Sequence, residues 1–119
     1  MHCDMEDGMR WFILIQFGFS AVLLMLLSIP MALGNIGRNG FYGMRTKKTL
    51  SSDEVWYPAN RYAGKALMLA GAVSLAGIAV LAAAGRNLSL GMVSGLGFAV
   101  LMLPIIVALF ASLRFVGRL

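Results

Sequence analysis

Residues 35–65 read NIGRNGFYGMRTKKTLSSDEVWYPANRYAGK and form the polar stretch of an otherwise apolar chain. This segment holds six of the ten Lys and Arg residues, two of the five acids, every Tyr and one of the two Trp. Long apolar runs lie on both sides of it. We therefore expect membrane helices around the segment and any functional site within it.

The composition excludes most soluble classes. The chain has 119 residues, of which 60% are hydrophobic and 13% are charged. A soluble protein of this size would need more polar residues to cover its surface. The net charge of +5 points first to membrane topology and anionic lipid. No basic recognition helix or nucleic-acid motif accompanies it, so we expect membrane lipids and no nucleic acid as partners.

Near the N-terminus, His2 and Cys3 stand beside three acids, Asp4, Glu6 and Asp7. These residue types can bind metals, but a short polar segment at a chain end is more typical of a frayed terminus. We expect neither a metal site nor a cofactor. The single cysteine also excludes an intrachain disulfide.

Three uncharged runs cover residues 11–33, 66–84 and 88–113. About 20 apolar residues cross a bilayer as a helix, so each run is long enough. The acidic leader of the first run argues against a cleaved signal peptide. Gly85-Arg86-Asn87 has the composition of a tight turn. The sequence predicts an all-α integral membrane protein with one domain, residues 1–119, and three transmembrane helices at about those positions.

The distribution of basic residues predicts the orientation. Residues 35–65 carry six Lys and Arg, the C-terminal residues carry two, and the N-terminus and the 85–89 turn carry one each. Because Lys and Arg accumulate on the cytoplasmic side, the N-terminus is expected outside and the C-terminus inside. We expect a multi-pass protein of the bacterial inner membrane.

Small residues recur every four positions on the second and third predicted helices. The positions are Ala66, Ala70, Ser74, Gly91, Gly95 and Ala99. Such residues let helices approach closely in lipid, either within one protomer or in a homo-oligomer, and both interpretations stay open. No ionisable residue lies in the three runs, which argues against a proton-coupled transporter and an intramembrane metalloprotease.

A helix is expected between the first two spans. Ser51 and Glu54 have the spacing of a capping box, which predicts a helix from about Ser52 toward Lys65 at the cytoplasmic interface. Pro58 predicts a kink, since it lacks the amide that would bond Glu54. Beyond the kink, the helix can continue into the second span.

The polar segment allows two interpretations. Its cations can contact anionic lipid head groups. Alternatively, arginine and polar side chains converge into a pocket for an anionic group, because the guanidinium fork suits phosphate and carboxylate. The pocket candidates are Asn35, Arg38, Tyr42, Arg45, Asn60 and Arg61.

The same segment resembles the SdpI family of bacterial membrane proteins. The resemblance rests on this pattern: Asn35, then Arg38-Asn39-x-Phe41-Tyr42-Gly43-x-Arg45-Thr46, Thr49-Leu50, Glu54-x-Trp56 and Asn60-Arg61-x-x-Gly64. The chain looks like a single motif-bearing unit of that family. The resemblance adds Thr46, Thr49, Glu54 and Trp56 to the candidate ligand-binding residues.

The resemblance implies toxic-peptide immunity or signalling, since a well-known member protects against a secreted toxic peptide and draws a transcriptional repressor to the membrane. A toxic peptide and a cytoplasmic repressor are therefore candidate partners. Two alternatives stay open: a small membrane enzyme or carrier acting on an anionic lipid or peptide, with Glu54 as general base, and an accessory subunit of a larger complex. No nucleophile–base pair or metal motif is visible, which favours a non-enzymatic protein with no catalytic residue.

Overall fold

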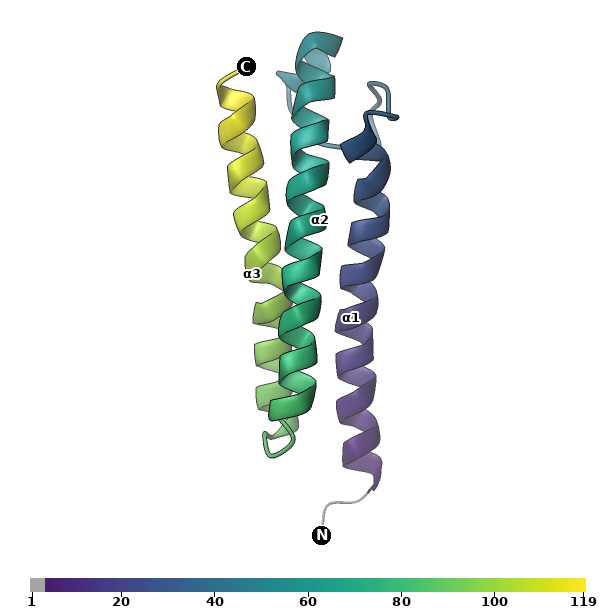
Figure 1. Ribbon diagram of the computed structural model, residues 1–119, viewed down its shortest axis with the longest axis vertical. Coiled ribbons are helices and arrows are strands. Elements are labelled where there is room, and N and C mark those ends of the chain that lie inside the picture. The colour runs from purple at the N-terminus through teal and green to yellow at the C-terminus, as the bar shows by residue number, and fades with distance from the viewer. Residues whose placement is uncertain (1–3) are drawn as a thin grey trace.

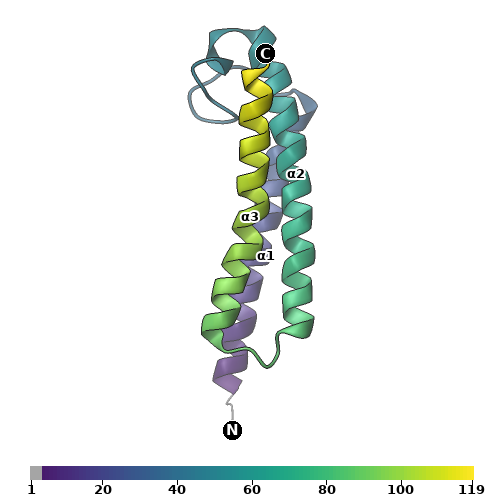
Figure 2. The ribbon, with the colours of Figure 1, turned by 90° about the vertical axis from the view of Figure 1, so that its left-hand side faces the viewer.

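A computed structural model describes residues 4–119 as three long helices lying side by side (Figures 1 and 2). Helix α1 spans Asp4–Leu33, α2 spans Asp53–Ala84 and α3 spans Leu90–Gly117, and a single 3₁₀ turn, η1, spans Thr49–Ser51. The bundle measures 61 × 21 × 19 Å. All three helices are long and apolar enough to cross a membrane, so the prediction of a helical chain with three such helices is confirmed over the described residues.

The separate interfacial helix predicted between the first two spans is wrong. Helix α2 runs without a break from Asp53 to Ala84, and Pro58 lies inside it. Proline there removes one intrahelical hydrogen bond, to the carbonyl of Glu54, while the buried Ala59 and Ala63 on the next turn continue the helix. The alternative, continuation beyond Pro58 into the second span, is the one observed.

The predicted capping box is also absent. Ser52, and not Ser51, is the N-cap of α2, and its side chain makes no capping hydrogen bond. Ser51 belongs to η1, where its hydroxyl donates to the carbonyl of Lys48. Asp53 and Glu54 still occupy the first turn, where carboxylates favour the positive end of the helix dipole.

Helix α1 starts earlier than the apolar run that predicted it. Residues 4–10 are helical, and not frayed, while His2 and Cys3 lie outside the described residues. Arg10 extends from this part of α1 to the α2–α3 turn and donates hydrogen bonds of 2.8 Å to the carbonyls of Gly85 and Leu88. Within residues 4–119, no three His, Cys, Asp or Glu side chains gather as a metal site would require.

The other end of α1 is terminated by a glycine. Gly34 has a φ of 74°, the left-handed conformation that glycine adopts without steric cost. Its amide donates to the carbonyl of Met31 at 3.1 Å, and the amide of Asn35 donates to the carbonyl of Pro30 at 3.0 Å. This pair of hydrogen bonds is a Schellman motif, and it turns the chain from α1 into the polar segment.

Close helix packing depends on small residues that the four-residue spacing only partly identified. Ala70 and Ser74 on α2 are buried, and the Ser74 hydroxyl donates to the carbonyl of Leu101 on α3 at 3.1 Å. On α3, the predicted row of small residues does not pack within the protomer at Gly95, where an added Cβ would have no neighbour within 4 Å. The close contact is made by Gly97, where an added Cβ would lie 2.6 Å from Phe17 of α1. The homo-oligomer interpretation stays a prediction.

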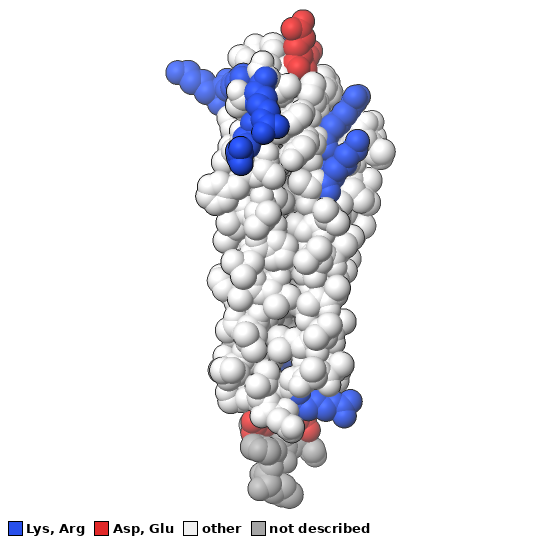
Figure 3. All heavy atoms as spheres, turned by 60° about the vertical axis from the view of Figure 1, so that its left-hand side comes forward, with Lys and Arg blue, Asp and Glu red and all other residues white. Residues whose placement is uncertain are grey.

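Charged side chains lie at the two ends of the bundle, and the face in Figure 3 shows a wide uncharged belt between them. The end formed by the polar segment and the C-terminus carries eight of the ten Lys and Arg and two of the five acids. Helices of 28 to 32 residues are about 42–48 Å long, against a hydrocarbon core of about 30 Å, so their ends extend into the head-group regions.

Candidate functional site

Residues 34–52 fold over the first turns of α2. We call residues 34–65, which include those turns, the cap. Trp56 and Asn60 stand one helical turn apart on α2 and are both buried. The Trp56 indole Nε1 donates to the carbonyl of Ile36 at 2.7 Å, and Asn60 Oδ1 accepts from the amide of Met44 at 2.6 Å. Trp56 and Asn60 thus hold residues 36–44 at both ends.

A pair of threonines organises the next part of the cap. The buried Thr49 hydroxyl accepts a 2.7 Å hydrogen bond from the amide of Thr46 and donates to the carbonyl of Met44 at 2.9 Å. The Thr46 hydroxyl accepts from the amide of Thr49 at 3.1 Å. These exchanges satisfy the backbone where no regular helix or strand exists, and they fix the position of η1.

Gly43 allows the segment to pass close to α2. Its φ is 106°, and a Cβ there would lie 2.6 Å from Asn60 Oδ1 and 3.3 Å from the Trp56 ring. The preceding turn is closed by Asn39, whose Oδ1 accepts from the amides of Phe41 at 2.8 Å and Tyr42 at 2.6 Å. A glycine is therefore required at this position for both conformation and space.

Tyr42 links the cap to α1. Its phenol donates a hydrogen bond to the carbonyl of Leu27, and burial raises the pKa of this phenol above its ordinary value. The neutral form, which is the one able to donate, therefore persists to higher pH than in a free tyrosine. Tyr42 thus connects the cap to α1 through a hydrogen bond.

Two of the three candidate arginines have partners inside the cap. Arg38 Nε lies 2.8 Å from Asp53 Oδ1 in an ion pair, and its Nη1 donates to the carbonyl of Leu50 at 3.2 Å. Arg45 donates through Nη1 to the carbonyl of Gly40. Both side chains are exposed, so each guanidinium retains donors that face the surroundings.

Arg61 differs from these two arginines. Its guanidinium packs against Gly34, where a Cβ would lie 2.8 Å from Nη2. The side chain is exposed, and among the described residues it has no hydrogen-bond or ion-pair partner. Arg61 therefore presents a full set of guanidinium donors beside the end of α1.

The structure brings together only some of the candidate residues. Thr49 and Asn60 both bond the backbone of Met44, Thr46 bonds Thr49, and Asn60 also donates to the carbonyl of Trp56. Asn35 and Glu54 are exposed, and their side chains make no hydrogen bond within the described part of the chain. The three arginines contact different partners, so their convergence on one anion stays a prediction. Sequence reasoning did not anticipate the pairing of Asp53 with Arg38 or the close approaches at Gly34 and Gly43.

Residues 35–112 match the family model described as the SdpI/YfhL protein family. The match begins in the cap and extends through α2 and most of α3. Neither a curated protein nor a solved structure is similar enough to the chain to be matched.

Proposed function

Since this chain belongs to the SdpI/YfhL protein family, we propose that it is a non-enzymatic membrane protein of toxic-peptide immunity or signalling. In this proposal the cap binds an anionic group, carried by a peptide, a lipid or a cytoplasmic repressor. The cap contains both the motif that resembles the family and most of the positive charge of the chain.

The observation that carries the proposal is the state of Arg61. The buried polar groups of the cap, such as Asn60 and Thr49, are satisfied within the protein. Arg61 is instead exposed without a partner in the described residues, next to a backbone fixed by the Schellman motif. An exposed guanidinium without a partner in the described residues is suited to a carboxylate or phosphate from outside the chain.

We further propose that the cap and the C-terminus face the cytoplasm of a bacterium and that the N-terminus faces outward. The charge difference between the two ends of the bundle supports this orientation. A reporter enzyme that folds only outside the cytoplasm is expected to be inactive when fused after Leu119. Strong activity of that fusion would reverse the orientation.

Removal of Arg61 and of Arg45, one at a time, tests the binding proposal. We expect Arg61→Ala and Arg45→Ala to reduce affinity for the anionic partner by about tenfold to a hundredfold, since a hydrogen bond to a charged group contributes about 1.5–3 kcal/mol. The measurement is survival of a deletion strain that carries each variant, under its own secreted toxic peptide.

Arg86→Ala is the matched control, because Arg86 is an exposed arginine in the turn between α2 and α3. Figure 1 shows this turn at the end of the bundle opposite the cap. All variants must reach the membrane in equal amounts. Loss of protection in the two cap variants, with normal protection in Arg86→Ala, would support the proposal. Normal protection and signalling in both cap variants would refute it.

A further inference from the structure

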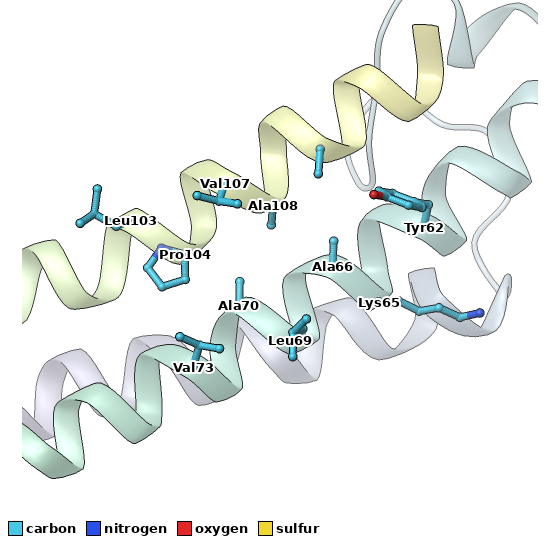
Figure 4. A pocket seen from close by; sticks show the side chains of 11 residues that line it. Tyr62, Lys65, Ala66, Leu69, Ala70, Val73, Leu103, Pro104, Val107 and Ala108 are labelled. Carbon is cyan, nitrogen blue, oxygen red and sulfur yellow. The ribbon is translucent and has the colours of Figure 1, made fainter. Parts of the chain in front are cut away.

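A groove of about 680 Å³ opens between α2 and α3 in the half of the bundle nearer the cap (Figure 4). The buried Ala70 of α2 and Ala108 of α3 point toward each other at the bottom of the groove. Its sides are exposed aliphatic residues from the two helices: Leu69, Val73, Leu103 and Val107. The groove is therefore an apolar channel that is open toward the lipid.

Sequence features of both helices keep this space open. Alanines at 66 and 70 on α2 and at 108 and 111 on α3 leave no side chain long enough to fill it. Pro104, which also lines the groove, removes an intrahelical hydrogen bond from α3 and favours a bend there. Figure 1 shows α3 leaning away from α2 toward the cap end.

The cap end of the groove is aromatic and cationic. The Tyr62 ring stacks on Phe115 with centroids 4.4 Å apart, and a second cavity of about 200 Å³ behind this pair is lined by Arg114 and Arg118. Lys65 lies at the rim, and its side chain extends along α2 toward the cap end (Figure 4). The described linings of both cavities contain these three cations and no carboxylate.

The dimensions of the groove fit one leaflet of a bilayer. From Tyr62 to Val73 the groove follows α2 for about 16 Å, at 1.5 Å per residue. The hydrocarbon core is about 30 Å thick, so this length is about half of it. Tyrosine and lysine at its outer end are residues that prefer the head-group depth, with apolar stems in the core and polar tips outside.

We propose that this groove binds one acyl chain of an anionic phospholipid, with the lipid phosphate against Lys65, Arg114 and Arg118. The proposal assigns a second site: of the cap residues it uses Tyr62 and Lys65, and it uses neither Arg45 nor Arg61, the two arginines tested for the proposed function. Charge complementarity selects the occupant: an acyl chain fills the apolar length, and an anionic head group neutralises the cations at the end.

A second copy of the chain fits this groove less well. In a dimer across this face, both copies have the same membrane orientation and meet through the same surface. Two sets of Lys65, Arg114 and Arg118 would then lie at the same depth with no carboxylate in either lining. Like charges brought together in this way oppose association.

The test compares two phospholipids that differ only in the head group. Purified protein is incubated with phosphatidylglycerol or phosphatidylcholine carrying identical acyl chains, and retained lipid is counted by native mass spectrometry. We expect the wild type to retain phosphatidylglycerol preferentially, and Lys65→Gln and Arg114→Gln each to lower its retention about fivefold. Arg86→Gln, at the far end of the bundle, should retain it normally.

A groove-filling variant separates this site from general lipid contact. Ala66→Leu should abolish retention, whereas Ala72→Leu, an exposed alanine of α2 outside the groove, should not. Circular dichroism verifies that both variants fold. Equal retention of the two lipids by the wild type, or normal retention by Ala66→Leu, would overturn the proposal. A stable dimer that excludes the lipid would overturn it in favour of a second copy.

Discussion

Replacement of Gly64 by alanine is expected to separate α1 from α2 and to destabilise the bundle. A Cβ on Gly64 would lie 2.8 Å from the carbonyl oxygen of Ser28 and 2.9 Å from the Cα of Ala32, and closer still to the amide nitrogen of Ala32. These are backbone atoms of α1, so no side-chain rotation can relieve the clash. Overpacking of this kind costs about 1–3 kcal/mol or more, and we expect the upper end of that range.

Gly95→Ala is the matched control for this substitution. Gly95 also lies within a long helix, but a Cβ there would meet nothing within 4 Å. Alanine in a helix interior is more favourable than glycine by about 1 kcal/mol, so this variant should be neutral or stabilised. Thermal unfolding of both variants in the same detergent measures the difference. Equal melting temperatures would show that α1 and α2 are not in contact at Gly64.

The second large effect is expected at Trp56. This side chain is fully buried and holds Ile36 through its indole Nε1. Trp56→Ala removes that hydrogen bond and leaves a cavity under the cap, at a cost of about 3–5 kcal/mol. We expect the spans to remain helical while residues 36–50 lose their fixed conformation, because those residues form no long helix of their own.

Trypsin measures this loss of conformation, since Arg45, Lys47 and Lys48 offer cleavage sites within the cap. Cleavage there should be slow in the wild type and in Trp11→Ala, whose tryptophan is exposed on α1, and fast in Trp56→Ala. If Trp56→Ala were cleaved no faster than the wild type, the cap would not depend on its buried tryptophan.

The three spans could be predicted because a bilayer imposes a length and excludes charge, and residues 11–33, 66–84 and 88–113 satisfy both conditions. The helix boundaries could not be predicted in the same way. Helix α1 extends to Asp4 and α2 to Asp53 because polar residues outside the hydrocarbon core can remain helical. Hydropathy records where the membrane ends, and not where the helix ends.

Local sequence motifs did not predict the correct residue where tertiary contacts decide between two similar neighbouring positions. Ser51 and Ser52 are both good N-cap residues, but the Thr46–Thr49 hydrogen bonds place η1 so that Ser51 lies inside it. Helix α3 offers more than one row of small residues. Gly97 faces Phe17 and Gly95 faces outward, and this choice depends on the packing of α1, which spacing alone cannot specify.

The composition and the family motif both directed attention to the cap, and the family match, over residues 35–112, begins there; that the cap is the functional site stays a prediction. The roles of individual residues were not deducible. Trp56, Asn60 and Thr49 belong to the same motif as the arginines, yet they are buried and bond the backbone of the cap. All three candidate arginines are exposed, but Arg38 pairs with Asp53 and Arg45 bonds the carbonyl of Gly40, whereas Arg61 has no partner among the described residues.

The central claim is that residues 34–52 are held rigidly against the first turns of α2, so that the cap, residues 34–65, presents Arg61 in a fixed position. Amide hydrogen exchange of the wild-type protein in detergent tests this claim most directly. We expect slow exchange at Met44 and Thr46, whose amides are bonded to Asn60 and Thr49, and fast exchange at the exposed Lys47 and Lys48. Uniformly fast exchange across residues 36–50 would contradict the account, because a mobile segment could not hold the site that we propose.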